Sequence, residues 1–362
     1  MKKVLIVDDS ALMRKLLTGV LGEGGYEVKS ARNGAEGVEM VVQWQPDVVT
    51  LDINMPEMDG LTALSLIMSA RPTPVVMVSS LTEKGALATF EALALGAVDF
   101  IPKPGGTISL HVDDIKAMLL DKVRSASRAQ MRGTRGARSA APARPQLRPA
   151  PQAATAAPTQ RAGQVAGQVA VQMAGLVLIG VSTGGPRTLE DILPRLPANF
   201  PWPILVSQHM PANFTETFAR RMDGLCALKV VEVAQAMPLT AGHVYIGRGG
   251  TDLTVTDRVG VLHVAPRPET PAVLWHPSVE VMVDSAMKHL PPHRLLGVML
   301  TGMGNDGAAA MKRLHSAGGR TIAESAETAV VFGMPHELIE LQGASLVLPC
   351  TGIAAQLRAW LA

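Results

Sequence analysis

The sequence is short of cysteine and of aromatic side chains. Its only cysteines, Cys226 and Cys350, give neither a disulfide framework nor the paired spacing of a zinc site. We expect both to pack as small apolar side chains, and we expect the protein in the reducing cytoplasm. Aromatic residues make up 3% of the 362 residues, but hydrophobic residues of all kinds make up 47%, which is enough for two domains with separate cores.

Long hydrophobic runs are missing as well. The run Gly175–Val181 is far shorter than the roughly 20 residues that a bilayer-spanning helix needs. At the N-terminus, lysines precede Val4–Val7 as in a signal peptide, but two aspartates end this run and no small-residue cleavage site follows. We therefore interpret Val4–Val7 as a buried strand and predict that no part of the chain inserts into a membrane.

Acidic residues, lysine, isoleucine and aromatic residues are all absent from residues 125–174. The segment is rich in Ala, Pro, Gln and Arg, a composition that buries too little apolar surface to offset the entropy of ordering the chain. We predict a disordered linker here, between one domain at residues 1–124 and another at residues 175–362.

The linker also carries the positive charge of the sequence. Without its seven arginines, the 33 basic residues of the chain fall to 26, against 31 acidic residues. Binding of these arginines to nucleic acid or to a membrane surface is one interpretation. Because no stacking side chain accompanies them, a solvated tether is favoured, and we predict no nucleic-acid partner.

The first 124 residues alternate five times between strand-like and helix-like patterns. Strands are predicted at Val4–Val7, Tyr26–Ser30, Val48–Leu51, Val75–Val78 and Val98–Ile101. Helices are predicted at Ala11–Leu21, Ala35–Trp44, Leu61–Ser69, Lys84–Leu95 and from Val112 to about Val123. This alternation predicts a doubly wound, five-stranded parallel α/β sheet with a ligand crevice at the carboxyl ends of its strands.

The chain after the linker predicts a second doubly wound α/β domain. Leu176–Val181, Pro203–Ser207 and Leu295–Leu300 have the continuous apolar character of buried strands. The stretch from His243 to Val264 alternates instead around a Gly-Arg-Gly-Gly turn, and we predict that it forms an inserted antiparallel β-hairpin.

Polar side chains stand at the predicted carboxyl ends of four N-terminal strands. Asp8 and Asp9 follow the first strand, Asp52 the third, Ser79 the fourth and Lys103 the fifth. The three carboxylates should converge at the switch point of the sheet, where Mg²⁺ would relieve their mutual repulsion. Alternatively, a strand-end aspartate such as Asp9 only caps the next helix.

These residues stand in the motifs Val-Asp-Asp-Ser, Leu-Asp-Ile-Asn-Met-Pro-Glu-Met-Asp-Gly, Val-Ser-Ser and Ile-Pro-Lys-Pro. Over residues 1 to about 124, they resemble the receiver domains of bacterial response regulators. The resemblance implies that Asp52 accepts a phosphoryl group from a histidine kinase. It also implies that Asp9, Asp52 and the backbone carbonyl of Asn54 hold Mg²⁺, with support from Asp8.

The same resemblance assigns three further positions in the receiver. Ser79 and Lys103 would contact the phosphoryl oxygens, and Phe100 would occupy the aromatic switch position. The chemistry agrees, because the metal ion and Lys103 can stabilise the charge of the transferring group.

A second set of polar residues follows the strands of the C-terminal domain. Ser182 lies in Gly-Val-Ser-Thr-Gly, a strand-to-helix turn of the Gly-x-Ser-x-Gly type, which presents a serine hydroxyl. His209 and Asp306 follow two other predicted strands, so the three side chains meet the requirements of a nucleophile, a base and an orienting carboxylate.

Other interpretations exist for each member of this triad. Glycine-rich turns also bind phosphate or simply pack, His209 could be an ordinary loop histidine, and Asp306 could cap a helix at Gly307–His315. The chain order Ser, His, Asp also differs from the Ser, Asp, His order of α/β-hydrolases, which argues against that fold.

Five motifs carry a second resemblance, and they are Gly-Val-Ser-Thr-Gly-Gly-Pro, Gln-His-Met-Pro, His-Pro-Ser-Val-Glu, Leu-Thr-Gly-Met-Gly-Asn-Asp-Gly and Val-Phe-Gly-Met-Pro. Over residues 175–362 they resemble the chemotaxis protein-glutamate methylesterases. The resemblance implies hydrolysis of glutamate γ-methyl esters on chemoreceptors, deamidation of particular receptor glutamines, and a chemotaxis histidine kinase as phosphodonor. Ser182, His209 and Asp306 take the triad positions, the backbone N–H of Met303 would bind the oxyanion, and the esterase needs no cofactor.

The sequence departs from this family at Asn54, Val181 and Arg248, where an acidic residue, a smaller residue and a proline are commoner. None of these positions belongs to the triad.

We hypothesise that the unphosphorylated receiver limits access to Ser182 and that phosphorylation relieves this. The alternatives are a non-catalytic, phosphorylation-dependent interaction protein, and a DNA-binding regulator, which the absence of a helix-turn-helix pattern disfavours.

Overall fold

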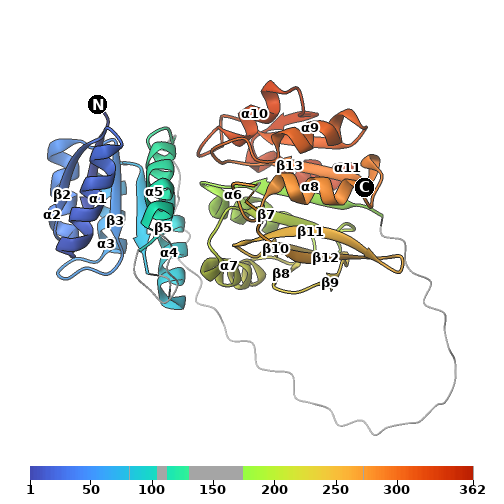
Figure 1. Ribbon diagram of the computed structural model, residues 1–362, viewed down its shortest axis with the longest axis horizontal. Coiled ribbons are helices and arrows are strands. Elements are labelled where there is room, and N and C mark those ends of the chain that lie inside the picture. Colours follow the sequence, from blue (N-terminus) through green and yellow to red (C-terminus); the bar gives the residue numbers. More distant parts are fainter. Residues whose placement is uncertain (81, 104–111, 130–173, 272, 362) are drawn as a thin grey trace, which may run out of the picture. The chain divides into compact units, whose positions relative to one another are not determined.

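The computed structural model describes residues 1–80, 82–103, 112–129, 174–271 and 273–361. Figure 1 shows the two sheets and the helices of these ranges. They belong to one compact unit. None of the helices in the described ranges combines the length and apolar character that a membrane-spanning segment requires. Most of the predicted linker lies outside the described residues; helix α5 ends at Ala126 and strand β6 begins at Leu176.

The N-terminal sheet is five-stranded and wholly parallel, in the order β2-β1-β3-β4-β5, which confirms the predicted doubly wound fold. Its strands are β1 (Lys3–Val7), β2 (Glu27–Ala31), β3 (Val48–Asp52), β4 (Val75–Ser79) and β5 (Asp99–Pro102). Its helices are α1 (Ala11–Glu23), α2 (Gly34–Trp44), α3 (Gly60–Ala70), α4 (Glu83–Leu95) and α5 (Val112–Ala126). Strands β3 and β4 are buried at every residue, as expected of central strands covered on both faces.

Side-chain caps fix where the first four helices begin. The oxygen of each capping side chain accepts a hydrogen bond from a backbone N–H of the first turn; the caps are Ser10, Asn33, Asp59 and Thr82. Since Ser10 caps α1, the exposed carboxylate of Asp9 is not used for that purpose. The interpretation of Asp9 as a helix cap is therefore wrong.

The C-terminal sheet has seven parallel strands in the order β15-β14-β13-β6-β7-β10-β8. They are β6 (Leu176–Val181), β7 (Ile204–Gln208), β8 (Lys229–Val233), β10 (His243–Gly247), β13 (Leu295–Met299), β14 (Arg320–Glu324) and β15 (Leu346–Leu348). The chain starts at β6 in the middle, builds outward through β7, and later returns to add β13 on the other side of β6. This reversal makes the carboxyl ends of β6, β7 and β13 the expected binding crevice.

Helices and a short antiparallel sheet complete the C-terminal domain. The helices are α6 (Gly185–Ile192), α7 (Ala212–Leu225), α8 (Val279–Met287), α9 (Ala308–Ser316), α10 (Met334–Glu340) and α11 (Cys350–Leu361), with 3-10 turns η1 (Leu193–Arg195) and η2 (Pro292–Arg294). The antiparallel sheet comprises β9 (Met237–Pro238), β11 (Thr251–Arg258) and β12 (Val261–Pro268).

One part of the predicted hairpin is wrong. His243–Gly247 does not pair with the following strand but forms β10 of the parallel sheet, between β7 and β8. Val244, Tyr245 and Ile246 are all buried, so this strand is covered on both faces, although its sequence begins with an alternating polar and apolar pattern. The hairpin itself consists of β11 and β12, which pair from Thr251 with Pro268 to Arg258 with Val261.

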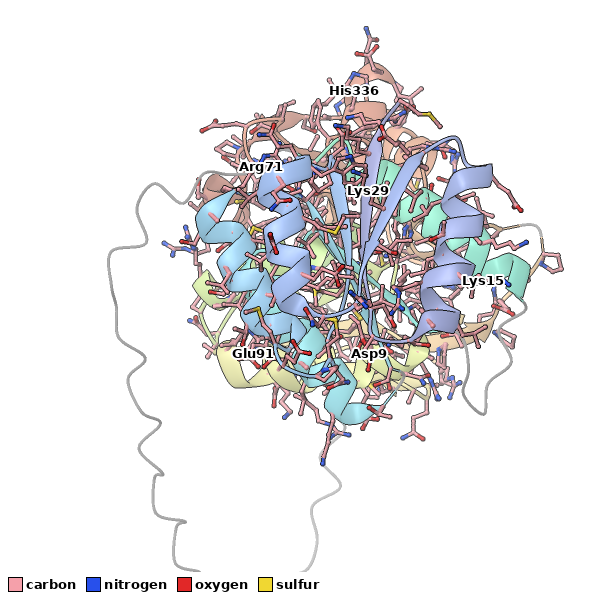
Figure 2. All side chains as sticks on the ribbon, turned by 90° about the vertical axis from the view of Figure 1, so that its left-hand side faces the viewer. Asp9, Lys15, Lys29, Arg71, Glu91 and His336 are labelled. Carbon is pink, nitrogen blue, oxygen red and sulfur yellow. The ribbon has the colours of Figure 1, made fainter. Side chains whose placement is uncertain are left out.

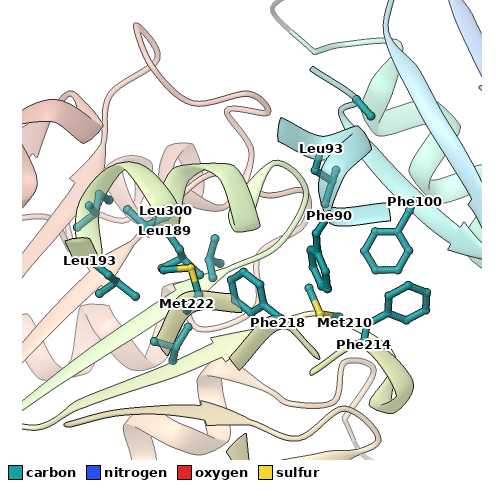
Figure 3. Close-up of a cluster of buried hydrophobic side chains, with 14 of the residues drawn as sticks. Phe90, Leu93, Phe100, Leu189, Leu193, Met210, Phe214, Phe218, Met222 and Leu300 are labelled. Carbon is teal, nitrogen blue, oxygen red and sulfur yellow. The ribbon is translucent and has the colours of Figure 1, made fainter. Parts of the chain in front are cut away.

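Aromatic side chains from the two domains share one buried cluster (Figure 3). Phe90 of α4 stacks on Phe218 of α7 with ring centroids 5.4 Å apart. Phe100 of β5 lies 4.3 Å from Phe214, also on α7. All four rings are at most 3% exposed, so the contact between α4, β5 and α7 is a packed hydrophobic interface.

Candidate functional site

The carboxylates of Asp8, Asp9 and Asp52 converge at the carboxyl ends of β1 and β3. One ligand oxygen from each lies within 4.8 Å of the others, and Asp8 and Asp52 are buried. Asp9, which Figure 2 labels, is exposed. Such a cluster is typical of a Mg²⁺ site, because this ion takes a few carboxylates and completes its shell with water or phosphate oxygens.

Lys103 neutralises part of this negative charge. Its Nζ lies 2.7 Å from Asp52 Oδ2 and 3.2 Å from Asp8 Oδ2. Burial is the largest influence on the pKa of Asp52 and raises it, Asp8 adds to the rise, and the hydrogen bond from Lys103 opposes it. Asn54 lies beside this pair, with its backbone N–H 3.4 Å from Asp52 Oδ1.

The other two predicted receiver positions, Ser79 and Phe100, lie in different surroundings. Ser79 ends β4, where its buried hydroxyl donates to the backbone oxygen of Gly85, and its own carbonyl accepts a hydrogen bond from the N–H of Lys103. Phe100 is 3% exposed and contacts Phe214. Ser79 thus lies at the carboxyl end of β4, whereas Phe100 lies in the interface between the domains.

The turn that carries Ser182 is held by its neighbours on both sides. The Ser182 N–H donates to the carbonyl of Thr301 after β13, and its carbonyl accepts a hydrogen bond from the side-chain amide of Gln208 at the end of β7. A Cβ atom at Gly185 would lie 2.0 Å from Gln208 Oε1. Gly184 has a φ of 81°, a conformation that glycine adopts without strain.

His209 and Asp306 are joined by a hydrogen bond, as the predicted triad requires. His209 Nε2 lies 2.9 Å from Asp306 Oδ2, and the two side chains are 7% and 6% exposed. The backbone N–H of His209 donates to the backbone carbonyl of Val181, which places the histidine beside the residue that precedes Ser182. Among the described residues, His209 Nδ1 is buried and has no hydrogen-bond partner, including the hydroxyl of Ser182.

Asp306 binds the start of a neighbouring helix, α8, whose N-cap residue is Ser278, whereas the sequence suggested that Asp306 caps the helix that follows it. Its carboxylate accepts hydrogen bonds from the Ser278 hydroxyl and from the N–H groups of Val279 and Glu280, which begin α8. The cap of α9 is instead Gly307. Burial alone would raise the pKa of Asp306, but the hydrogen bonds from His209 and from the start of α8 hold this pKa below its usual value.

The predicted oxyanion residue Met303 lies in the loop after β13, close to the serine. In the same loop, a Cβ atom at Gly302 would lie 2.8 Å from Ser182 Cβ. The Gly302 carbonyl accepts hydrogen bonds from the N–H groups of Gly333 and Met334, which fixes the loop. Within the described parts of the chain, the Met303 N–H donates to no backbone carbonyl.

Sequence reasoning missed several side chains that shape this site. Gln208 and Ser278 each stand in a motif that carried the family resemblance, and that was the available signal. Trp275 stacks on the imidazole of His209, with ring centroids 5.0 Å apart and planes 9° apart. Its approach to a residue far away in the sequence leaves no local pattern.

Thr183, beside the nucleophile position, contacts the N-terminal domain. Its hydroxyl donates to Asp99 Oδ2 over 2.6 Å, and both side chains are buried. Lys122 of α5 forms an ion pair with the other oxygen of Asp99 at 2.7 Å. One carboxylate of β5 is therefore shared between its own domain and the turn that carries Ser182.

Comparison with known proteins gives two family matches. Residues 177–357 match the CheB methylesterase family, and residues 4–113 match the response regulator receiver domain. The chain is 53% identical to protein-glutamate methylesterase/protein-glutamine glutaminase 3 of Rhodospirillum rubrum, over 100% of this chain and 96% of that protein. It is also 53% identical to protein-glutamate methylesterase/protein-glutamine glutaminase 2 of Rhodopseudomonas palustris, over 99% of this chain and 98% of that one.

A solved structure, the catalytic domain of Thermotoga maritima CheB methylesterase, is 39% identical, with a TM-score of 0.49, and covers 51% of this chain and 97% of that one. The identity with the two bacterial relatives extends over almost their whole length and includes both domains. With a receiver at its N-terminus and a methylesterase domain at its C-terminus, the chain belongs to the CheB family of protein-glutamate methylesterases/protein-glutamine glutaminases.

Proposed function

We propose that this protein hydrolyses glutamate γ-methyl esters on chemoreceptors, and deamidates particular receptor glutamines, under the control of its receiver domain. Family membership supports the reaction class. The observation that carries the assignment to residues is the buried hydrogen bond between His209 and Asp306, beside the turn that presents Ser182. The protein would act in the cytoplasm, where the signalling parts of chemoreceptors and their kinase are found.

In the proposed reaction, Ser182 Oγ attacks the ester carbonyl and His209 takes its proton. Because the ionised Asp306 only accepts hydrogen bonds, His209 Nε2 carries a proton and Nδ1 is the base. The N–H of Met303 would stabilise the oxyanion. The imidazolium then protonates the departing methoxide, which leaves as methanol, and a water molecule deprotonated by His209 releases the glutamate and regenerates Ser182. With a glutamine substrate, ammonia is the leaving group.

Control of the enzyme would begin at Asp52, which accepts a phosphoryl group from a chemotaxis histidine kinase. Asp8, Asp9, Asp52 and the carbonyl of Asn54 would hold Mg²⁺, which supplies positive charge to the transferring group. Lys103 and the Ser79 hydroxyl would then contact the phosphoryl oxygens. The present hydrogen bond of Lys103 to Asp52 supports this, because it keeps the ammonium at the acceptor carboxylate.

We infer that the unphosphorylated receiver restricts access to Ser182. The contact between Asp99 and Thr183, and the packing of α4 on α7, support this, because both lie next to the strand ends that carry the triad. Phosphorylation would shift the docking equilibrium by changing the contacts of β5, which ends next to Lys103.

Methanol release from methyl-labelled chemoreceptor membranes tests the proposal. The full-length protein would be assayed with and without a small phosphodonor and Mg²⁺, beside residues 175–362 alone. We expect low activity without the phosphodonor, and higher activity with it and from the isolated domain. Equal rates in all three samples would refute the inhibition. Ser182→Ala should abolish methanol release; unchanged release would favour a different catalytic residue, and no release from the unmodified protein would favour an interaction protein.

A further inference from the structure

We propose that Trp275 is a positioning residue of the esterase, which acts through His209 by holding the imidazole ring and by stabilising its protonated form. The inference rests on the proposed function and deepens it, since it concerns the base of the same reaction. It starts from a contact that the triad itself does not require, the stacking of the indole on the imidazole.

The stack removes a freedom that the hydrogen bond to Asp306 leaves. A single bond from Nε2 to Asp306 Oδ2 fixes one point of the imidazole, but the ring can still tilt about that point. The indole lies with its plane 9° from the imidazole plane and its centroid 5.0 Å away, so tilting toward the indole would produce overlap. Nδ1 is therefore kept in one place for proton transfer, which is the usual source of rate gains from orientation.

The indole also matches the change of charge on His209 during the reaction. When His209 takes the serine proton, the imidazole becomes a cation next to the face of a tryptophan, the aromatic side chain that attracts cations most strongly. The attraction is present only while the ring is protonated, so it favours the transition state over the resting enzyme. Asp306, on the far side of the hydrogen bond, acts in the same direction.

Trp275 is held in this position by residues that follow it directly. His276 Nδ1 lies 2.9 Å from Oδ1 of Asp252, whose side chain is fully buried, and the Ser278 N–H donates to the same oxygen. The Ser278 hydroxyl donates to Asp306. Residues 275–278 thus contact both members of the His209–Asp306 pair. Trp275 stacks on His209, and the Ser278 hydroxyl donates to Asp306.

The indole also reaches the loop of the predicted oxyanion site. A Cβ atom at Gly304 would have Trp275 Nε1 as its nearest neighbour, at 4.0 Å. Trp275 thus stacks on His209 and also lies close to Gly304, in the loop that includes Met303.

Three substitutions in the full-length protein, assayed with phosphodonor and Mg²⁺ on methyl-labelled receptor membranes, separate the contributions. Trp275→Ala should lower kcat roughly ten-fold, within the range for a cation–π contact plus lost orientation, with KM changed less than about three-fold. Trp275→Phe keeps an aromatic face and should restore most of kcat. Trp275→Leu keeps apolar volume without an aromatic face, so it should restore less of kcat than Trp275→Phe does. Trp202→Phe, at a tryptophan packed against Gly175, is the control and should leave kcat unchanged.

A proton NMR spectrum of the histidine rings measures the stack independently of activity. The indole should shift the ring protons of His209 upfield, the signals being identified by their absence from His209→Gln. Trp275→Ala and Trp275→Leu should lose the shift and Trp275→Phe should retain part of it. A His209 signal without the shift in the unmodified protein overturns the inference, even if no substrate is cleaved.

The kinetic outcomes are equally decisive. Unchanged kcat in Trp275→Ala, or a rise in KM alone, would overturn the proposal, the latter by showing a substrate contact. Full activity of Trp275→Leu would show that Trp275 contributes to kcat by packing alone and that its aromatic face has no effect. If Ser182-dependent methanol release is absent from the unmodified protein, the proposed function fails, while the NMR shift still decides whether the stack exists.

Discussion

At the scale of single residues, Asp306 has two tasks that are usually assigned to different side chains. It accepts a hydrogen bond from His209, the proposed base, and it accepts hydrogen bonds from Ser278, Val279 and Glu280 at the start of α8. Both tasks require the ionised carboxylate, and the lowered pKa of Asp306 keeps it ionised. Orientation of the base and stability of the domain therefore depend on one charge.

We predict that Asp306→Asn lowers kcat by about 10³ to 10⁴, because the amide no longer selects the required tautomer or stabilises the imidazolium. The measurement is single-turnover methanol release by the phosphodonor-treated protein. Ser278→Ala, which removes only one of the partners of Asp306, serves as the control and should cost less than about ten-fold. Wild-type kcat in Asp306→Asn would remove the carboxylate from the mechanism.

The lowered pKa of Asp306 also predicts a dependence of stability on pH. A carboxylate whose pKa is lower in the folded state stabilises the fold above its unfolded pKa of about 3.9, and this contribution is lost as the pH falls through the folded value. The difference in Tm between the unmodified protein and Asp306→Asn should therefore be largest near neutral pH and shrink below about pH 4. The same difference for Ser182→Ala should not vary with pH. A constant difference for Asp306→Asn would contradict the expected linkage.

At the scale of helices and strands, the interface between α4 and α7 is the main contact that the proposed inhibition would use. Phe90 and Phe218 are stacked and buried, so they hold the receiver by hydrophobic burial as well as by the hydrogen bond of Asp99 to Thr183. Loss of either contribution should shift the docking equilibrium toward the state in which the receiver no longer restricts access to Ser182.

Phe90→Ala should raise methanol release in the absence of phosphodonor, roughly ten-fold if the docked state loses about 1.4 kcal/mol. The stimulation by phosphodonor should shrink by the same factor, since the open state is already populated. Leu66→Ala, at an exposed position on α3, is the control for general effects on the receiver. A fall in basal activity in Phe90→Ala would indicate that the contact supports catalysis.

The elements that could be predicted from the sequence were those with a continuous apolar run. The strands ending at Asp52, Ser79 and Val181 are buried throughout, and their sequences show it. Strand β10 was misassigned because an alternating sequence is also compatible with a buried strand. Strand β14 begins with the exposed Arg320, and β15, at the edge of the sheet, has only the three residues Leu346–Leu348, so neither shows a long apolar run.

The predicted site residues came from motifs at strand ends, because parallel strands bring their carboxyl ends together. The stack of Trp275 on His209 and the hydrogen bonds of Asp306 with the start of α8 had no such signal. Both join residues 26 or more positions apart through side-chain geometry, which periodicity and composition do not record.

At the scale of the whole molecule, the receiver carboxylates and the predicted triad each lie at the carboxyl ends of the strands of a parallel sheet, and the two sheets are separate. Strand β5 links them: it carries Asp99 and Phe100 toward the second domain and ends beside Lys103. A single strand thus separates Lys103 from the carboxylate that Thr183 contacts.

Removal of Mg²⁺ with a chelator should abolish the stimulation by phosphodonor and leave basal methanol release unchanged. The reason is that the three carboxylates that would hold the ion are in the receiver, whereas the triad residues include a single carboxylate, already used by His209 and α8. Asp52→Asn should behave in the same way with Mg²⁺ present. Loss of basal activity on chelation would place a metal requirement in the esterase domain.

The double use of Asp306 has a consequence for how such a protein could lose its chemistry. Replacing the hydroxyl of Ser182 would remove the proposed nucleophile and leave the backbone hydrogen bonds of the turn, whereas replacing the carboxylate of Asp306 would also remove hydrogen bonds from the start of α8. We therefore expect a related protein that has lost its activity and only signals to lack the serine at position 182 and to keep the aspartate at position 306. The presence of this aspartate alone is then poor evidence that a relative is still an enzyme.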